Sequence, residues 1–354
     1  MVNLDDMEIY KQLDPADMLA QLHGLPEQCR AAWHQSRELE LPPAYANIDK
    51  VIILGMGGSA IGGDLLRSLA SLRSKAIVLV NRDYDLPAFS DDRTLVIASS
   101  YSGNTEETLS AFSQALETNC KVLAITTGGK LKTLAERAGV PLFIVDHISQ
   151  PRAALGYSFL PLIALLQKIG LLEDKTAEVD TMIENLKALL GELKETVPGS
   201  SNRAKQLAAK LHGKIAVIYG AGILSEVARR WKSQINENGK SWAFHETFPE
   251  LNHNAVVGYQ FPQELATKMH VVLLRCPPLH PRVLLRYQIT CELLEQNGIS
   301  YQIINSQGEN ELSQIMSLAF FGDWTSYYLA ILNETNPTPV KAIDYLKQRL
   351  NDSE

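Results

Sequence analysis

A loop rich in hydroxyl side chains is the feature of this sequence best suited to binding chemistry. The loop spans 99–108 and carries Ser100, Ser102 and Thr105 around a single glycine. It follows an apolar, strand-like run and leads into a helix-like segment, 106–116. Such a loop directs backbone N–H groups, hydroxyls and the positive end of a helix toward one spot, which suits a phosphate monoester. The alternative is an N-cap turn, since Ser and Thr also begin helices, but several hydroxyls beside a glycine favour phosphate.

A glycine-rich stretch upstream is the second candidate binding element. It reads Gly55-Met-Gly57-Gly58-Ser59 and follows the apolar run 51–54. Its spacing fits a dinucleotide fingerprint loosely, but that signal is weak by itself. The next strand ends in Asn81-Arg82, with no acidic residue to hold a ribose, and no Lys-Ser/Thr pair follows the glycines to make a P-loop. Ser59 suits a sugar instead, because it places a hydroxyl where the backbone comes close to a ligand.

Length, composition and net charge limit the number of domains and the classes of partner that this protein can have. The chain has 354 residues, 45% hydrophobic and 21% charged, which favours two domains with a large core. The net charge is −7 without any basic run, so nucleic acid and anionic membranes are poor partners. We expect no apolar stretch long enough to span a bilayer. The acidic N-terminus also lacks the order of a secretory signal.

The cysteines and histidines predict neither a disulfide framework nor a metal site. The four cysteines lack CxxC spacing and are scattered at Cys29, Cys120, Cys276 and Cys291. We interpret them as reduced thiols of a cytoplasmic protein. Of the eight histidines, only His245 and His253 are neighbours. We therefore expect no metal and no other cofactor.

Apolar strand-like runs alternate with helical patterns, which predicts parallel sheets covered on both faces. The predicted strands are 51–54, 76–80, 95–98, 122–125, 142–145, 214–219, 271–275 and 301–304. The predicted helices, after helical segments within 3–45, are 65–72, 106–116, 131–138, 155–168, 179–196, 224–238, 284–297 and 312–332. The fold class is therefore α/β, with two doubly wound domains. We place the first domain and its N-terminal segment at 1–154, connecting helices at 155–200, and the second domain with a C-terminal helix at 201–354.

The motifs together resemble one known family. GMGGSAIGGD, SYSGNTEET, QPRAA, INENGK, ELNHN and NPTPVKAIDYLK occur in this order, as they do in the bifunctional phosphoglucose/phosphomannose isomerases. These enzymes belong to the phosphoglucose isomerase superfamily and contain two sugar isomerase (SIS) domains. The resemblance runs from about Gly55 to Lys347. It implies an aldose–ketose isomerase that interconverts glucose 6-phosphate, and also mannose 6-phosphate, with fructose 6-phosphate.

The resemblance also implies a role for each matching residue. The residues that match the sugar-phosphate site are Gly58, Ser59, Ser100, Ser102 and Thr105. Glu237 matches the base that moves a proton between C1 and C2, and Arg152 matches an arginine beside the enediolate. His253 matches the ring-opening histidine, which the family supplies from the partner subunit, so a homodimer with shared sites is implied. Lys347 matches a lysine near the ring oxygen, with Lys341 as the alternative.

General chemistry supports these roles without the family name. One carboxylate can remove and return the proton if partial burial raises its pKa. A cation stabilises the enediolate oxygen, and a histidine of near-neutral pKa can open the ring. None of these steps requires a metal.

Each residue also has a plainer interpretation. Glu237 could be solvated at a helix end, His253 could be a structural histidine, and Arg152 could cap a helix or pair with Asp146. Lys347 could be a solvated lysine on an amphipathic helix.

Two other functions fit parts of the pattern. A non-catalytic sugar-phosphate regulator would keep the hydroxyl loop but lack the Glu/His pair. An isomerase of aminosugar phosphates would be expected beside a glutaminase domain with an N-terminal cysteine, whereas this chain starts Met1-Val-Asn-Leu. Activity on mannose 6-phosphate stays open, because the threonine that the family associates with it matches either Thr338 or the slot of Val340.

Overall fold

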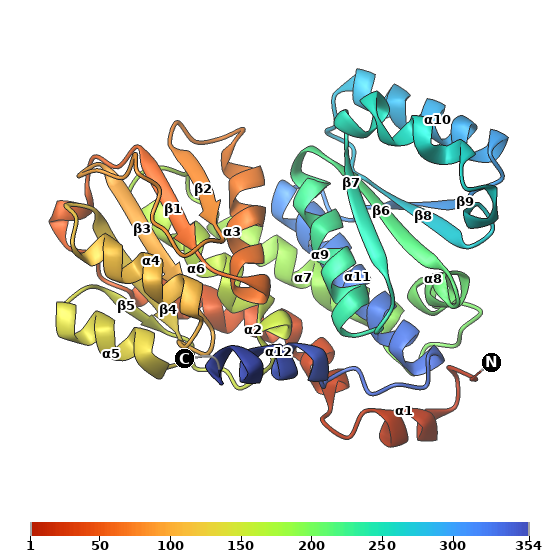
Figure 1. Cartoon of the computed structure of the whole chain (residues 1–354), viewed down its shortest axis with the longest axis horizontal. Helices are drawn as coiled ribbons and strands as arrows, with labels where there is room; N and C mark the ends of the chain where they lie inside the picture. Colours follow the sequence, from red (N-terminus) through yellow and green to blue (C-terminus); the bar gives the residue numbers. More distant parts are fainter. Residues whose placement is uncertain (1, 353–354) are drawn as a thin grey trace.

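The computed structural model describes residues 2–352 and contains two parallel β-sheets with helices between them and outside them (Figure 1). The first sheet has the order β2-β1-β3-β4-β5 and the second the order β7-β6-β8-β9, and every pairing is parallel. The predicted α/β fold class with two sheets is thereby confirmed. The strands are β1 Lys50–Leu54, β2 Ile77–Asn81, β3 Thr94–Ser99, β4 Lys121–Thr126, β5 Leu142–Ile144, β6 Ile215–Ala221, β7 Ala243–Phe248, β8 Met269–Arg275 and β9 Ser300–Asn305.

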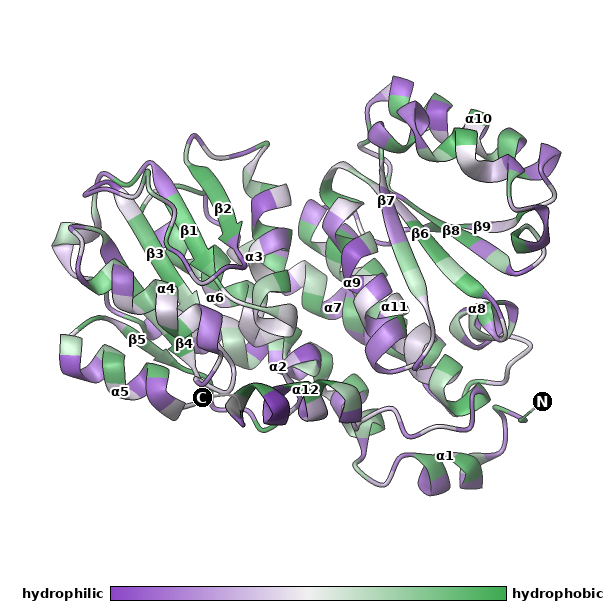
Figure 2. Cartoon of the chain, viewed as in Figure 1, coloured by the Kyte–Doolittle hydropathy of each residue, from purple (hydrophilic) through white to green (hydrophobic). Residues whose placement is uncertain are grey.

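The central strands are mainly apolar because both faces of each sheet are covered (Figure 2). In β1, Val51 and Ile53 face the large core in the middle of the molecule, while Ile52 and Leu54 face a smaller outer core. In the second sheet, β6 and β8 divide their side chains in the same way. The helices are α1 Met7–Leu13, α2 Met18–Glu38, α3 Gly57–Ala70, α4 Glu106–Leu116, α5 Gly129–Ala138, α6 Leu155–Lys168, α7 Thr176–Leu193, α8 Arg203–Leu211, α9 Ser225–Glu237, α10 Pro281–Gln296, α11 Glu311–Leu332 and α12 Lys341–Asn351.

The helices between the two sheets join the first half of the chain, which contains β1–β5, to the second half, which contains β6–β9. Helix α6 packs on α2 and α3, whereas α7 packs on α11 and α2. One continuous core therefore runs through residues on both sides of positions 154 and 200. The three-part division at these positions stays a prediction.

The structure corrects one local expectation and contains two elements that were not predicted. The stretch at Gly57 is not a turn before a helix at residue 65, because α3 already begins at Gly57. A Cβ at Gly62 would lie 1.9 Å from the carbonyl oxygen of Ser158, so this glycine serves close packing of α3 on α6. Strand β7 and helix α8 were not predicted. Strand β7 is an edge strand with Phe244 and Glu246 exposed, so it lacks an apolar run, and α8 is short and follows a linker-like stretch.

Helix α11 corrects the expectation about long apolar segments. Among residues 2–352 it is the one helix long and apolar enough to cross a membrane. Its apolar window is completely buried inside the protein, where it contacts α7, α8 and α9. Its apolar surface is therefore covered by the fold itself.

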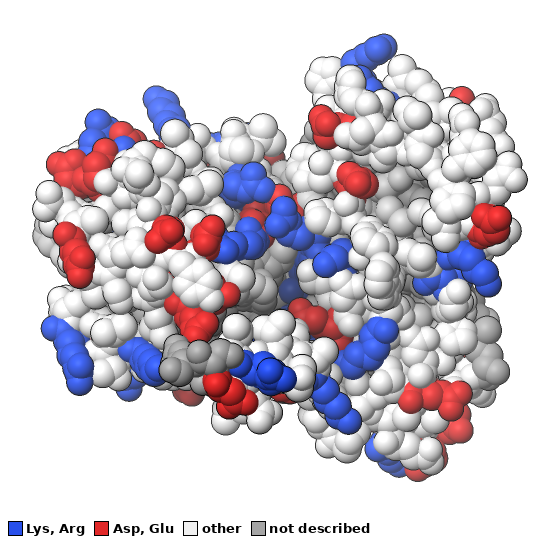
Figure 3. Space-filling view, viewed as in Figure 1, with Lys and Arg blue, Asp and Glu red and all other residues white. Residues whose placement is uncertain are grey.

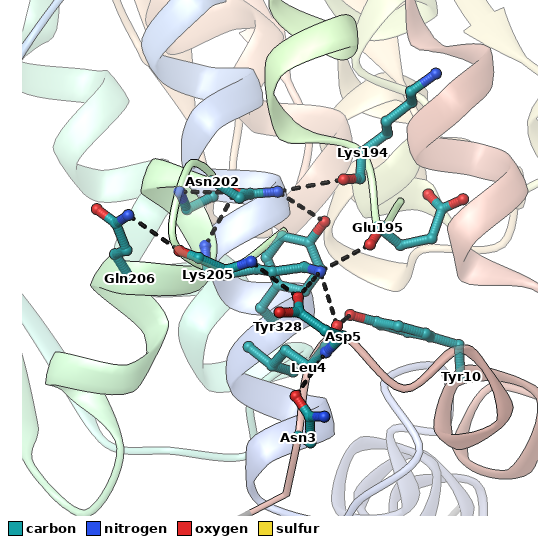
Figure 4. Close-up of polar contacts among 12 residues, drawn as sticks. Asn3, Leu4, Asp5, Tyr10, Lys194, Glu195, Asn202, Lys205, Gln206 and Tyr328 are labelled. Atoms are coloured by element: carbon teal, nitrogen blue, oxygen red, sulfur yellow. Dashed lines mark hydrogen bonds and ion pairs between the residues drawn. The ribbon is translucent and has the colours of Figure 1, made fainter. Parts of the chain in front are cut away.

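The two ends of the described chain are held very differently. Near the start, buried Lys205 of α8 donates hydrogen bonds to the carbonyl oxygens of Leu4 (2.7 Å) and Glu195 (2.7 Å) and to Asp5 Oδ1 (2.9 Å) (Figure 4). The bond from Lys205 also lowers the pKa of Asp5. This network fastens the N-terminal segment to the second half. Near the end, every residue of α12 from Lys341 to Leu350 is exposed.

Candidate functional site

The hydroxyl loop joins β3 to α4, and its side chains bond to one another. Ser100 is fully buried, and its Oγ lies 2.9 Å from Thr105 Oγ1 while accepting a hydrogen bond from the Gly103 N–H (3.1 Å). Thr105 occupies the N-cap position of α4, yet its side chain makes no capping bond. Ser102 is exposed, and its Oγ accepts from the Asn104 N–H at 3.3 Å. The helix start therefore lacks a cap from Thr105, which leaves its first N–H groups for another acceptor.

Ser59 and Gly58, at the start of α3, connect this loop to the rest of the site. Ser59 Oγ accepts a hydrogen bond from the Tyr101 N–H at 3.0 Å. A Cβ at Gly58 would lie 2.6–2.7 Å from backbone atoms of Pro151 and Arg152, so only glycine lets these two segments touch. Both loops follow the carboxyl ends of neighbouring parallel strands, β1 and β3, which is where ligands bind in open α/β sheets.

Arg152 is one of the residues that connect the two halves of the molecule. It is 5% exposed, and its Nε donates to Asn238 Oδ1 at 2.7 Å. Its Nη2 donates to the carbonyl oxygens of Pro337 (2.9 Å) and Thr338 (2.7 Å). Burial lowers the pKa of Arg152, and the Glu237 carboxylate acts against that shift. These contacts, rather than helix capping or a pair with Asp146, are what the arginine makes.

Glu237 is the last residue of α9 and faces Arg152. Its Oε2 lies 3.7 Å from Arg152 Nη1, and its side chain is 27% exposed. The carboxylate lines a cavity of about 200 Å³ together with Gly57, Gly58 and Arg152. It also lines a second cavity of about 700 Å³, on the side of Lys240 and Lys341. A small ligand can therefore reach Glu237 while Arg152 is already fixed beside it.

Two residues next to Glu237 contribute contacts that the sequence reasoning did not assign. Asn238 is 1% exposed and orients Arg152, while its own Nδ2 donates to Ser326 Oγ at 3.0 Å. Lys240, interpreted from sequence as a supporting or surface residue, donates from Nζ to the carbonyl oxygens of Glu237 and of Pro337 (3.1 Å). Burial and the charge of Arg152 lower the pKa of Lys240 to about 8. The signal for both was their place in the same Asn-Glu-Asn-Gly-Lys stretch.

His253 and the C-terminal lysines complete the predicted set. His253 ends the short 3₁₀ turn Glu250–His253 and is exposed. Lys347 is exposed on α12, whereas Lys341, at the start of that helix, lines the 700 Å³ cavity beside Glu237. One chain thus brings together Gly58, Ser59 and the hydroxyl loop, and joins them through residues 151–152 to Glu237. It does not bring His253 or Lys347 to that cluster.

No group of three or more His, Cys, Asp or Glu side chains within residues 2–352 is arranged to hold a metal ion. All four cysteines are free, and Cys29, Cys276 and Cys291 are buried.

Comparison with known proteins places the chain in a family. Residues 200–350 match the model of the bacterial phospho-glucose isomerase C-terminal SIS domain. A bifunctional phosphoglucose/phosphomannose isomerase of Caldicellulosiruptor bescii is 45% identical over 334 residues, which cover 94% of this chain and 98% of the relative. The chain belongs to the bifunctional phosphoglucose/phosphomannose isomerase family.

Another member agrees with this family assignment, and a solved structure agrees with the fold. The bifunctional phosphoglucose/phosphomannose isomerase of Aquifex aeolicus is 38% identical over 85% of this chain and 90% of its own length. A glucose-6-phosphate isomerase-like protein of Thermus thermophilus shares the fold, with a TM-score of 0.64 at 18% identity over 96% of this chain and 98% of that one. The predicted resemblance to the phosphoglucose/phosphomannose isomerases is therefore confirmed.

Proposed function

We propose that this protein interconverts glucose 6-phosphate and mannose 6-phosphate with fructose 6-phosphate through a cis-enediolate. The observation that carries the proposal is the Glu237 carboxylate, held 3.7 Å from the buried guanidinium of Arg152. A lone base beside a fixed cation suits removal of a proton next to a carbonyl, because negative charge develops where the cation already stands. The names of the family relatives agree with this reaction.

The hydroxyl loop and the start of α3 hold the phosphate in this proposal. Ser100, Ser102 and Thr105 provide hydroxyls and the uncapped start of α4 provides N–H groups, while Ser59 lies close by through its bond to Tyr101. Gly58 keeps the backbone open at the point of closest approach. Phosphate binding at a helix start uses both the N–H groups and the positive end of the helix dipole.

Glu237 carries the proton from one carbon to the other. It removes the proton from C2 of the aldose, or from C1 of the ketose, and returns it to the neighbouring carbon. Arg152 Nη1 faces the enediolate oxygen, because the other donors of this side chain are engaged by Asn238, Pro337 and Thr338. No step in this sequence needs a metal.

His253 of a second subunit opens the sugar ring, and the active protein is a homodimer. The exposure of His253 and its separation from the Arg152 cluster within one chain support a contribution in trans. A lysine of α12 lies at the ring oxygen: Lys347 by the family match, with Lys341 as the alternative, since it lines the cavity beside Glu237.

Room for both C2 epimers depends on the segment that precedes α12. Thr338 accepts a hydrogen bond from Arg152 through its carbonyl, and its buried hydroxyl has no partner within the described residues. Val340 lines the 700 Å³ cavity with Glu237. We propose that the space between these two side chains lets the site accept mannose 6-phosphate as well as glucose 6-phosphate.

The free thiols fit a reducing compartment, so a cytoplasmic location belongs to the proposal.

A coupled assay on the purified protein tests the proposal directly. Fructose, glucose and mannose 6-phosphates are each supplied, and the other two are measured, with and without a chelator. We expect conversion among all three and no loss with the chelator. Conversion of none of them contradicts the isomerase assignment, and conversion without mannose 6-phosphate restricts it to the glucose epimer.

A further inference from the structure

The strand order of the first sheet places an arginine on the far side of the glycine-rich start of α3 from the hydroxyl loop. In the order β2-β1-β3, Asn81 of β2 and Ala98 of β3 both stand level with Leu54 of β1. Arg82 therefore follows β2 at the same edge where the hydroxyl loop follows β3. Two strand spacings separate these positions, about 10 Å, with Gly57 and Gly58 between them.

The 200 Å³ cavity beside Glu237 opens on this side and is lined by cations. Besides Arg152, its walls carry Arg82 from the first half and Arg229 and Lys232 from α9. Figure 3 shows Lys and Arg side chains gathered along the hollow between the two halves of the molecule. The start of α3 faces the same cavity, with Gly57 and Gly58 in its wall.

Carboxylates pair with most of these cations but leave Lys232 without a partner among the described residues. Arg82 pairs with buried Asp64. Glu226 is shared between Arg229 (2.9 Å) and Arg67. Lys232 makes no hydrogen bond or ion pair within residues 2–352.

Two further observations concern a free donor and the positive charge in the wall of this cavity. Arg230, which is 2% exposed and lines the cavity, pairs with buried Asp323 through Nη2 (2.7 Å), but its buried Nε has no hydrogen-bond partner within residues 2–352. Burial lowers the pKa of His245 in the same wall, and the charges of Arg229 and Lys232 lower it further. The wall of the cavity thus contains more cations than carboxylates, and Lys232 and Arg230 Nε are donors in it that have no partner among the described residues.

We propose that this cavity is a second anion subsite, which takes a phosphate carried at the C1 end of a hexose 6-phosphate. The proposal rests on the proposed function, because that function sets the direction of the sugar. With its 6-phosphate in the hydroxyl loop and C1–C2 at Glu237, the ligand extends over Gly58 toward Arg82, Arg229 and Lys232. A hexose 1,6-bisphosphate then occupies both subsites at once.

Such a bisphosphate acts as an inhibitor of the site rather than as a substrate. A ketose with a phosphate ester on its C1 oxygen cannot become an aldose, because that oxygen cannot form the carbonyl. It binds across Glu237 and excludes the monophosphate. The cavity has room for one phosphate group, and its cations favour a doubly phosphorylated sugar over a singly phosphorylated one.

Calorimetry with two hexitol phosphates tests the subsite without turnover. Glucitol 6-phosphate and glucitol 1,6-bisphosphate lack the carbonyl and differ only in the second phosphate. We expect the bisphosphate to bind the full-length protein at least about tenfold more tightly, as added bonds to charged groups allow. Lys232→Glu should remove most of that tenfold ratio and Lys232→Gln part of it.

The matched control is Lys268→Glu, which should keep the wild-type ratio. Lys268 is exposed just before β8, at the amino-terminal end of a strand and thus at the edge opposite the site. Ser102→Ala should weaken both ligands and leave their ratio unchanged. Equal binding of the two hexitols, or a ratio that Lys232→Glu does not change, overturns the subsite while the isomerase proposal stands. Failure of glucitol 6-phosphate to bind overturns both.

Discussion

The residues assigned to catalysis fall into two regions that the fold treats in opposite ways. Arg152 and its neighbours are buried, and three of the hydrogen bonds from this guanidinium end on Asn238, Pro337 and Thr338. His253 and Lys347 lie on exposed segments that make no contact with that cluster among the hydrogen bonds and ion pairs of the described chain. The proposed reaction therefore uses one region whose side chains are already held in place within a single chain. It also uses a second region whose side chains are exposed and lie apart from the first.

This difference indicates which steps of the reaction can rely on groups that one chain already holds in position. Stabilising an enediolate requires a cation fixed before the charge develops, because reorganisation during the reaction costs part of the benefit. Arg152 meets this requirement within one subunit. Ring opening is a separate proton transfer, and the groups assigned to it come from surfaces that another subunit or a closing helix can bring into place.

The largest effect is expected at the buried region, from Glu237→Gln. The amide keeps the shape of the side chain but cannot take a proton, and general-base losses are typically about 10²–10⁴-fold. We expect kcat to fall by that factor with little change in KM, because the phosphate contacts lie elsewhere. Steady-state kinetics check this prediction. The matched control is Glu117→Gln, at an exposed position at the end of α4, which should keep the wild-type kcat.

An isotope measurement sharpens the same prediction. Substrate deuterated at C2 should lose part of its label to solvent during turnover, since the carboxyl proton exchanges. Complete retention of the label, or an unaltered kcat in Glu237→Gln, contradicts proton transfer by this carboxylate.

The next largest effect is expected from removing two hydroxyls of the loop, in Ser102→Ala/Thr105→Ala. Each bond to a charged phosphate contributes about 1.5–3 kcal/mol, so KM for the sugar phosphates should rise by about 10²-fold or more. The midpoint of thermal unfolding should fall only modestly, because Ser102 is exposed and buried Ser100 Oγ loses its bond to Thr105 but keeps the one from the Gly103 N–H. A fall in kcat at constant KM would instead place these hydroxyls at the reacting carbons.

A smaller effect is expected from Asn238→Ala, which tests how Arg152 is positioned. The substitution leaves Arg152 Nε without its acceptor at 2.7 Å, and kcat should fall by about tenfold while KM changes little. Asn238→Asp supplies an oxygen for Nε and should recover part of the rate. The control is Asn297→Ala, since Asn297 bonds to a backbone carbonyl at the end of α10. An equal loss of kcat in both alanine variants would mean that Asn238 matters only for folding.

The exposed region is tested by mixing two inactive variants, Glu237→Gln and His253→Ala. If His253 acts in the partner's site, a hybrid two-fold dimer contains one intact site, and random exchange restores about a quarter of the wild-type activity. Exchange is verified with differently tagged subunits. Absence of recovery after exchange places His253 in its own subunit's site or outside catalysis, and the comparison between the two regions then fails.

Much of the molecule could be predicted from the sequence, because local pattern and burial agree there. Helix α4 has the bounds 106–116 expected from its pattern, and the central strands were recognisable as apolar runs. The Asn-Glu-Asn-Gly-Lys stretch located Glu237 through the family resemblance. The contacts of Arg152 with Pro337 and Thr338 were not predictable, since 185 and 186 positions separate these partners in sequence.

The features that the sequence did not predict also depend on contacts between distant segments or on position in the sheet. Strand β7 lies at a sheet edge, where Phe244 and Glu246 face solvent, so its residues need not be apolar. The glycines of α3 suggested a loop, but Gly62 lies where α6 passes too close for a side chain. The cationic cavity combines Arg82 with residues of α9, and no local pattern connects these segments.

The smallest expected effect concerns the pH dependence of Lys240, at the border between the two regions. Burial and the charge of Arg152 lower its pKa to about 8, while Glu237 acts in the opposite direction. Lys240 therefore loses its charge as pH rises through about 8, well below the usual value for lysine. Lys240 Nζ bonds to the carbonyl oxygens of Glu237 and Pro337. The loss of its proton therefore removes positive charge from beside the enediolate, and kcat/KM should decline a few-fold on the alkaline side.

The variant Lys240→Arg keeps its charge throughout this range, so its pH–rate profile should lack that decline. An alkaline decline that persists unchanged in the arginine variant assigns the titration to another group and leaves Lys240 as a structural tie between α9 and the segment before α12.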